Sequence, residues 1–370
     1  MNRISAGGIL CALAACAGMG CALAPVVLPP TATTPAVRCE SSGKTAAALK
    51  DPDWQKRLTA ARCISESGGH LGVKELLAAL KDDRPEVRAQ AALGLGELGR
   101  TGAKKRLLLM LQSDPAAMAR AAAAQALGML VVRKAEAPLA AAMKSDPSAL
   151  VREAAAEALS HSEARAAPED LMLALKDKDS GVRLAAARSL ADFQGLPVAR
   201  TLSAVMLFDK DEAVRAAAAR SLGRCCSSGP PAVSFDVGYD DAGGPFFDPG
   251  FDPFFDPYPY EMVVVRLGRT HGALQHDVQA ALENVLAKDN DALVRAEAAN
   301  GLGVSDEPQV EPFVVAALRQ DQSPSVRARA AMALGHLGFN EANEPLTAAL
   351  QDNDADVRME AEIALEMIKD

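Results

Sequence analysis

The sequence predicts an all-α protein, an α-solenoid of about nine helical hairpins with one irregular insertion. Three observations predict this fold class. Alanine occupies 75 of the 370 positions, whereas aromatic residues make up only 4 % of the chain. Alanine has the highest intrinsic helix propensity, and β-sheets need β-branched and aromatic residues, of which this chain is short. An arginine also recurs every 31 or 32 residues, and a single stretch of the chain interrupts the repeat.

The first part of the chain predicts an exported protein. Arg3 is followed by an uncharged stretch that runs to Val37, and residues 4–24 within it are apolar and rich in small side chains. A basic start, an apolar stretch and small residues together are typical of a secretory signal peptide.

The segment Leu13-Ala14-Ala15-Cys16 resembles the lipobox of bacterial lipoproteins. This resemblance implies a signal peptide over residues 1–15 and a lipid anchor on Cys16, where more than one acyl chain gives stable membrane attachment. By the same resemblance, alanine at the next position favours the outer membrane within the cell envelope. Two alternatives stay open: a signal peptide cut after Ala24, which gives a periplasmic or secreted protein, and an uncleaved membrane anchor.

Residues 16–43 are rich in proline, threonine and alanine, which predicts a flexible tether. The repeats follow. Each recurring arginine has an aspartate six residues before it. The nine pairs are Asp51 and Arg57, Asp82 and Arg88, Asp114 and Arg120, Asp146 and Arg152, Asp177 and Arg183, Asp209 and Arg215, Asp289 and Arg295, Asp321 and Arg327, and Asp352 and Arg358.

Each repeat predicts a pair of helices. Counted from the arginine, valine at −1, alanine at +3 and +4 and leucine or isoleucine at +7 form one apolar face of a helix. A shorter apolar segment precedes each aspartate, as in residues 73–80, and predicts the first helix. Glycine at +8 in five repeats lets helices approach closely or end. Hairpins of this kind bury their apolar faces by stacking, so we expect six of them over residues 44–226 and three over residues 271–370.

The pattern Asp-x4-Val-Arg-x2-Ala-Ala-x2-Leu-Gly resembles the short HEAT repeat, of the type found in phycobilisome linker-pigment lyases. The resemblance implies that the aspartates and arginines form a structural ladder, in which the aspartate caps the second helix and the arginine bridges neighbouring loops. A row of arginines that binds anionic ligands is the alternative. Because the likeness is confined to the repeats, it implies a scaffold, and a lyase-like protein that handles a pigment or cofactor remains the second interpretation.

Positions +1, +5 and +9 of the second helices differ from repeat to repeat. In proteins of the HEAT type the second helices line the concave groove, so the resemblance places these positions there. Position +5 includes Met332 and Ile363, and Arg188, Arg220 and Arg224 form a modest basic stretch. We expect a protein or peptide partner, of unknown identity, to bind this groove.

The insertion, residues 227–270, repeats Phe-Asp-Pro three times, and residues 235–260 contain nine of the 14 aromatic residues. Proline at this density excludes a helix. The candidate partner-binding residues here are Phe247, Phe251, Phe255 and Tyr258. A low-complexity insertion without a partner is the alternative.

The sequence contains none of the catalytic or metal-binding motifs that we sought, among them His-Glu-x-x-His and a phosphate-binding glycine loop. We therefore expect no enzyme, metal or cofactor. The net charge of −9 argues against nucleic acid. Export permits disulfides, and Cys39 and Cys63 are a candidate pair that would hold the tether on the first hairpin. The sequence thus predicts a lipid-anchored, exported scaffold, with a purely structural envelope protein as a further alternative.

Overall fold

The computed structural model describes residues 42–67, 72–161, 167–193, 195–227, 277–304 and 308–369. Within these ranges every regular element is a helix, which confirms the all-α class. None of the helices in these ranges has the length and apolar character needed to cross a membrane. The chain divides into two compact units, Met1–Ala164 and Arg165–Asp370, named here the N-terminal and the C-terminal unit.

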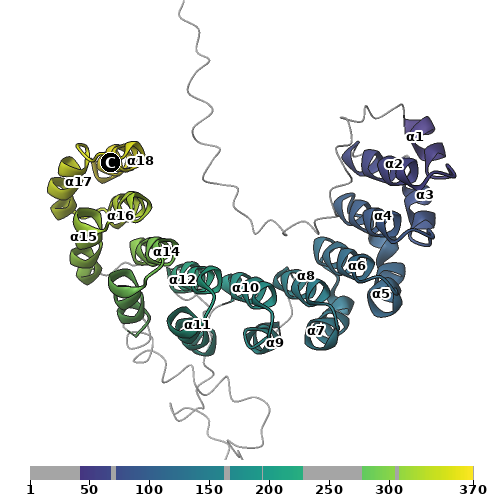
Figure 1. Ribbon diagram of the computed structural model, residues 1–370, viewed down its shortest axis with the longest axis horizontal. Helices are drawn as coiled ribbons and strands as arrows, with labels where there is room; N and C mark the ends of the chain where they lie inside the picture. Colours follow the sequence, from purple (N-terminus) through teal and green to yellow (C-terminus); the bar gives the residue numbers. More distant parts are fainter. Residues whose placement is uncertain are drawn as a thin grey trace, which may run out of the picture. The chain divides into compact units, whose positions relative to one another are not determined.

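The N-terminal unit contains four hairpins (Figure 1). Each second helix packs on the second helix of the next hairpin, and together they form a row that we call the second-helix row. The first helices form another row, the first-helix row, which packs against the second-helix row. The pairs are α1 (Ser42–Ala48) with α2 (Trp54–Glu66), α3 (Val73–Ala79) with α4 (Pro85–Glu97), α5 (Lys104–Ser113) with α6 (Ala117–Met129), and α7 (Glu136–Ser145) with α8 (Ala149–Ser160). The 3-10 turns η1 (Thr101–Ala103) and η2 (Arg133–Ala135) lead into α5 and α7.

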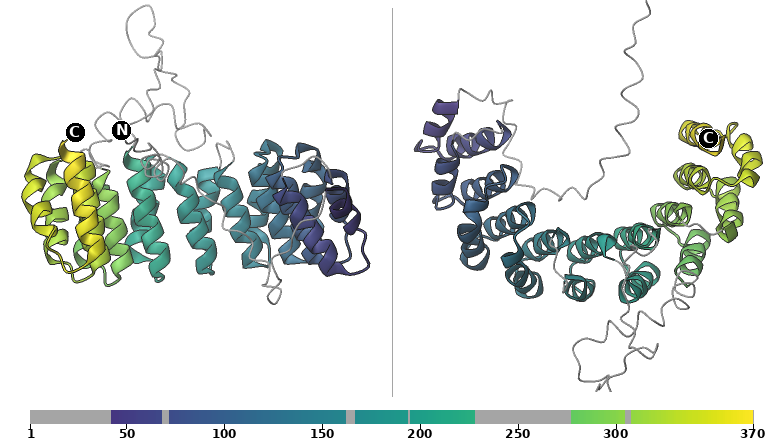
Figure 2. Two further views of the ribbon diagram at one scale, coloured as in Figure 1. Left: turned by 90° about the horizontal axis from the view of Figure 1, so that it is seen from above. Right: turned by 180° about the vertical axis from the view of Figure 1, so that it is seen from behind.

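The C-terminal unit repeats this plan, and Figure 2 shows its helices side by side from two further directions. Its pairs are α9 (Ala167–Ala174) with α10 (Ser180–Ser189), α11 (Leu196–Phe208) with α12 (Glu212–Ser227), the helix over residues 277–288 with α14 (Ala292–Gly303), α15 (Glu311–Gln320) with α16 (Pro324–Leu337), and α17 (Asn343–Ala349) with α18 (Ala355–Lys369). The 3-10 turns are η3 (Leu190–Asp192), η4 (Pro308–Val310) and η5 (Asn340–Ala342).

The repeated alanines form the core between the two rows. In α6, for example, Ala123, Ala124 and Leu127 are fully buried, and the equivalent residues of α4 and α8 are buried too. Alanine has no side chain beyond Cβ, so the helices that carry it can pack closely. The second helices begin after short turns, and Pro85 and Pro324 start α4 and α16, where a missing N–H is tolerated.

Glycine at +8 brings neighbouring second helices into contact. A Cβ atom on Gly128 of α6 would lie 2.9 Å from the Cα of Ala158 in α8. Of the two roles that the sequence allows for this glycine, close approach is therefore the one observed at this interface.

The step from Arg215 to Arg295 is 48 residues longer than the usual step of 32 residues between recurring arginines. The helices on the two sides of this long step nevertheless pack on each other. α12 packs directly on α14, and a Cβ atom on Gly223 would lie 2.7 Å from the Cα of Gly301. The chain between these two hairpins is therefore an addition outside the repeat unit. Of the predicted insertion, 227–270, all but Ser227 at the end of α12 lies outside the described residues.

Candidate functional site

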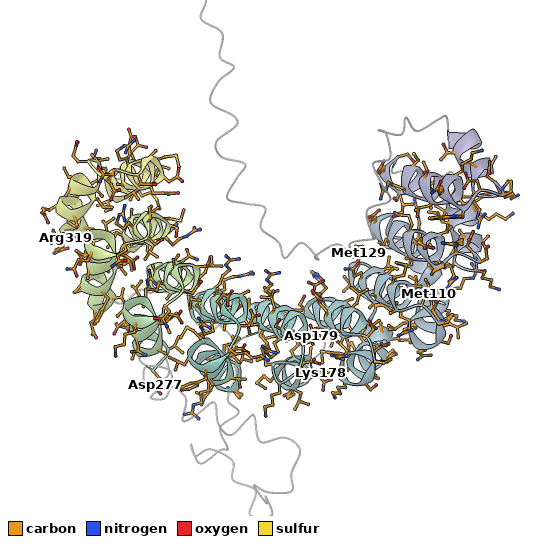
Figure 3. The ribbon with its side chains drawn as sticks, viewed as in Figure 1. Met110, Met129, Lys178, Asp179, Asp277 and Arg319 are labelled. Carbon is orange, nitrogen blue, oxygen red and sulfur yellow. The ribbon has the colours of Figure 1, made fainter. Side chains whose placement is uncertain are left out.

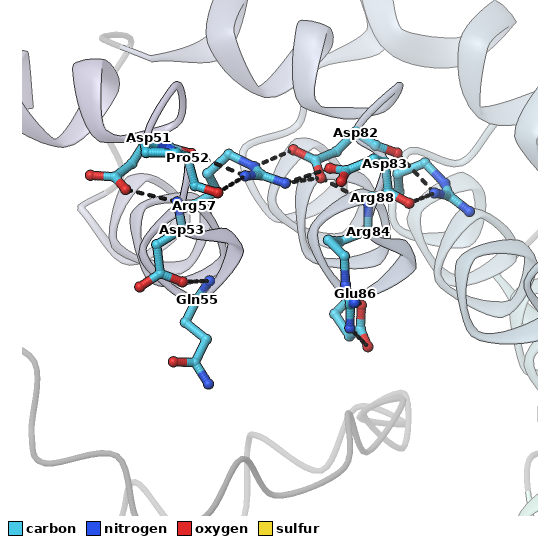
Figure 4. A network of polar contacts seen from close by, with 10 residues as sticks. All are labelled: Asp51, Pro52, Asp53, Gln55, Arg57, Asp82, Asp83, Arg84, Glu86 and Arg88. Carbon is cyan, nitrogen blue, oxygen red and sulfur yellow. Dashed lines mark hydrogen bonds and ion pairs between the residues drawn. The ribbon is translucent and has the colours of Figure 1, made fainter.

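The recurring arginine and aspartate form a ladder that joins consecutive repeats. Arg57 donates from Nε and Nη2 to the two carboxylate oxygens of Asp82, at 2.7 and 2.8 Å, and Arg88 does the same to Asp114 at 2.8 Å for both bonds (Figure 4 shows the first of these pairs). The remaining guanidinium nitrogen, Nη1, donates to the carbonyl oxygen of the aspartate in its own repeat, as Arg88 does to Asp82 at 2.8 Å. Each such arginine thus holds two loops together.

The same two-point contact occurs along the rest of both units. Its donor–acceptor distances lie between 2.8 and 3.1 Å in the pairs Arg120–Asp146, Arg183–Asp209, Arg215–Asp289, Arg295–Asp321 and Arg327–Asp352. Arg215 and Asp289 are 74 residues apart in sequence, so the ladder continues across the long step of the repeat. Arg152 and Arg358 bind the carbonyl oxygens of Asp146 and Asp352 in the same way.

The predicted capping role of the aspartate is wrong in its detail. The ladder carboxylate accepts the N–H of the residue two positions later, as Asp114 does from Ala116 at 2.9 Å, and it is Ala116 that is the N-cap of α6. The N-caps of α4 and α8 are likewise the residues two positions after their ladder aspartates. The ladder aspartate therefore orders the turn between the two helices and is not itself the N-cap of the second helix.

The carboxylate of Asp209 in the ladder is held in the ionised form. Burial is the largest single influence on the pKa of Asp209 and raises it, but the hydrogen bonds from Arg183 and from the N–H of Asp211, together with the charge of Arg183, lower the pKa below its usual value. A pKa that is lower in the folded chain than in the unfolded chain contributes stability above about pH 4, and that stability is lost as the pH falls further. At neutral pH the ladder is a structural feature, because carboxylates already occupy these guanidinium groups.

The structure modifies the predicted basic stretch. Arg220 donates through two nitrogens to Glu297, a carboxylate that is only 2 % exposed, and Arg224 donates to Asp192 at 2.8 Å. Arg188 is exposed and has no ion pair within the described part of the chain. Two of the three arginines are therefore neutralised by neighbouring repeats, and they do not form a free anion-binding surface.

An apolar stripe on the second helix of the last repeat, together with the groove beside it, is the strongest candidate site. Met359, Ile363 and Met367 of α18 are 50, 44 and 40 % exposed and four residues apart, so they lie along one side of the helix. Met359 borders a groove of about 580 Å³ between α16 and α18, together with Met332 at position +5 of α16.

The groove beside this stripe is acidic. Asp354, Asp356 and Glu360 line it against the single cation Arg329, whose Nη1 lies 3.5 Å from the sulfur of Met332. Methionine side chains are flexible and polarisable, which suits the binding of an apolar segment from another molecule. The groove is thus lined by two methionines and by more carboxylates than cations.

The two units differ strongly in charge, which the net charge of the whole chain conceals. Residues 1–164 contain 20 lysines and arginines and 15 aspartates and glutamates, a net charge of +5. Residues 165–370 contain 19 basic and 33 acidic residues, a net charge of −14. Counting the charge of each repeat separately would have found this asymmetry in the sequence.

Other predicted site residues lie outside the described residues. They are Cys16, Cys39, Phe247, Phe251, Phe255 and Tyr258. Cys63 in α2 is disulfide-bonded and 5 % exposed, and its pairing with Cys39 stays a prediction. Within the described ranges, no cluster of three or more His, Cys, Asp or Glu residues could hold a metal ion.

Residues 44–128, 136–223 and 279–366 match the sequence profile of HEAT repeats. The chain belongs to the HEAT-repeat family. This assignment confirms the predicted α-solenoid, and the matched segments exclude the stretch between α12 and the helix over residues 277–288. No curated protein matches the sequence of this HEAT-repeat chain.

Several solved structures resemble this HEAT-repeat protein in fold. The Escherichia coli protein YibA is 20 % identical, with a TM-score of 0.50 over 82 % of this chain and 95 % of its own. Kap95p, in a structure with RanGDP, is 16 % identical, with a TM-score of 0.54 over 89 % of this chain and 46 % of its own. The complex of CpcE and CpcF of phycocyanin lyase from Nostoc is 18 % identical, with a TM-score of 0.41 over 91 % of this chain and 97 % of that one. At these identities the likeness concerns the fold alone.

Proposed function

We propose that this protein is an exported, lipid-anchored HEAT-repeat scaffold, which binds a protein partner through the groove between α16 and α18. Binding rather than catalysis is the proposed activity. The observation that carries the proposal is the exposed stripe of Met359, Ile363 and Met367 beside an acidic groove. Large apolar side chains in a row are uncommon on a surface that faces only water, and they are typical of interaction sites.

The chemistry of the groove favours one kind of partner, an amphipathic helix with basic flanks. The spacing of the stripe along α18 matches the apolar face of a helix that would lie against it. The carboxylates of Asp354, Asp356 and Glu360 would attract lysine or arginine on the flanks of that helix and repel an acidic segment.

A synthetic peptide tests this proposal directly. An amphipathic helical peptide of leucine and lysine should bind the purified protein, as measured by fluorescence anisotropy, at least about tenfold more tightly than the same peptide with glutamate in place of lysine. The triple variant Met359→Ser, Ile363→Ser, Met367→Ser should weaken binding of the lysine peptide by about tenfold or more, because it removes the apolar contacts.

The matched control removes three exposed apolar residues from first helices of the same unit. Leu173, Phe208 and Phe313 are 54, 82 and 43 % exposed. Their replacement by serine should leave peptide binding within about twofold of the wild type. Equal losses in both triple variants, or equal affinity for the lysine and glutamate peptides, would contradict a partner site in this groove.

The export part of the proposal is supported by the basic start, the apolar stretch and the lipobox-like segment before Cys16. The disulfide at Cys63 also supports it, since disulfides persist in oxidising compartments outside the cytosol. A lipid on Cys16 would leave residues 17–41 between the membrane and α1.

Acyl labelling tests the anchor. Metabolic labelling with an alkyne fatty acid should modify the wild-type protein in a bacterial host, and the Cys16→Ser variant should lose the label and leave the membrane fraction. Cys11→Ser is the control, because Cys11 lies in the segment that would be removed, and it should keep the label. Label that persists in Cys16→Ser would refute lipidation at this residue.

A further inference from the structure

The first-helix row of the N-terminal unit carries a cationic surface. Elements α3, α5, η2 and α7 contain seven basic residues and two acidic ones. The corresponding helices of the C-terminal unit, α9, α11, residues 277–288, α15 and α17, contain three basic and six acidic residues. Of the two first-helix rows, only that of the N-terminal unit therefore has an excess of positive charge.

Four of these cations are exposed and unpaired within the described part of the chain. They are Lys74, Lys105, Arg106 and Lys134, and we call them the basic face. The ladder arginines of the same unit, such as Arg88 and Arg120, lie in the hairpin turns and are bound to aspartates. The basic face thus keeps its charge available for an external anion.

Apolar residues lie between the cations. On α5, Leu109 is 64 % exposed and follows Lys105 by four residues, so the two side chains share one side of the helix. In the turn that leads to α7, Val131 is 51 % exposed and has a φ of 45°, a conformation that β-branched residues rarely adopt. The turn therefore keeps a valine in the solvent next to the segment that carries Lys134.

We infer that the basic face binds the surface of an anionic lipid bilayer. Cations that are spread over successive helices, with single apolar side chains between them, match a layer of lipid phosphates with acyl chains beneath. The C-terminal unit, with its net charge of −14, has the wrong sign of charge to bind such a surface. The inference depends only on the N-terminal unit and needs neither the lipid on Cys16 nor the groove beside α18.

The test uses the chain from residue 17 onward, which keeps every described residue and cannot be lipidated at Cys16. Its binding is measured by co-sedimentation with vesicles of phosphatidylcholine alone and of phosphatidylcholine with an equal part of phosphatidylglycerol. We expect binding to the anionic vesicles only, and we expect added salt to weaken it. Each basic residue near an anionic surface contributes up to about fivefold in affinity, so Lys74→Gln, Lys105→Gln, Arg106→Gln and Lys134→Gln together should weaken binding by at least about tenfold.

The matched control changes the charge by the same amount in the C-terminal unit. Lys176, Lys178 (labelled in Figure 3), Lys210 and Lys288 are exposed there, and the four Lys→Gln changes should leave vesicle binding at or above the wild-type level. The variant Leu109→Ser distinguishes binding to a bilayer from binding to a soluble polyanion. It should weaken binding to the anionic vesicles, but it should not weaken binding to a short DNA duplex or to polyglutamate.

Three results would overturn the inference. They are the absence of binding to anionic vesicles, equal losses in the two quadruple variants, and a DNA duplex or polyglutamate bound as tightly as the vesicles, which would make the basic face a site for another macromolecule. The peptide assay on the groove is unaffected by any of these results, so failure of the membrane inference and failure of the proposed function are distinguishable.

Discussion

Arg183→Leu is expected to lower the free energy of unfolding of the C-terminal unit by about 3 kcal/mol, because it leaves a buried carboxylate without its cation. The side chains of Arg183 and Asp209 are 7 and 8 % exposed, and two hydrogen bonds of 2.8 and 2.9 Å join them. The same change removes the bond from Arg183 to the carbonyl oxygen of Asp177, so two loops lose their link at once. Urea unfolding followed by circular dichroism measures the effect.

Arg358→Leu is the matched control for this prediction. Arg358 holds the same position in the last repeat and makes the same bond to its own aspartate, Asp352, at 2.7 Å, but within the described residues it has no carboxylate partner. Its replacement should cost no more than about 1 kcal/mol, since only exposed hydrogen bonds to carbonyl oxygens are lost. A double-mutant cycle of Arg183→Leu with Asp209→Asn should give a coupling energy of about 2 kcal/mol. If Arg183→Leu cost no more than Arg358→Leu, the ladder would contribute nothing specific to stability.

Gly128→Ala is expected to destabilise the N-terminal unit by about 2 kcal/mol, although alanine is the better helix former. Gly128 lies inside α6, and an added Cβ would meet the Cα of Ala158 at 2.9 Å and its Cβ at 3.0 Å. Both neighbours belong to the fixed part of α8, so the helices must separate to make room. Trp54, the single tryptophan of the chain, lies in α2 of the same unit, and its fluorescence in urea reports the loss.

Gly102→Ala supplies the comparison. An added Cβ at Gly102, in the turn before α5, meets no atom within 4 Å. The same substitution there should change the free energy of unfolding by less than about 0.5 kcal/mol. A Gly128→Ala protein that is as stable as the wild type, or more stable, would show that the spacing between α6 and α8 does not depend on this glycine.

Most of the fold could be predicted because packing imposes its pattern on every repeat. Valine before the arginine, the two alanines after it and the following leucine recur because each second helix must fit the next, as Ala123, Ala124 and Leu127 do in α6. The resemblance to HEAT repeats predicted a ladder of aspartates and arginines. It did not predict which backbone groups each aspartate binds. Whether Asp114 caps a helix or orders the turn before it depends on backbone angles at Ala116, which the residue types do not determine.

The candidate sites were predicted less completely. The predicted groove included Met332 and Ile363 at position +5, but the sequence did not separate them from the other varying positions at +1, +5 and +9. The sequence did not show that Arg220 and Arg224 form ion pairs, because their partners, Glu297 and Asp192, lie on neighbouring repeats. The basic face was missed because its cations are spread over several helices and the acidic C-terminal unit outweighs them in the net charge.

The class of the molecule follows from the sequence, since the hydrophobic period and the repeated arginine and aspartate are local features that every hairpin must satisfy. Export stays a prediction, which rests on a linear pattern in the first residues. Which charges are neutralised and which apolar side chains stay in water can be seen only in the folded chain. The reason is physical: pairing and burial depend on atoms from separate repeats, and the distances between repeats are set by helix packing rather than by position along the chain.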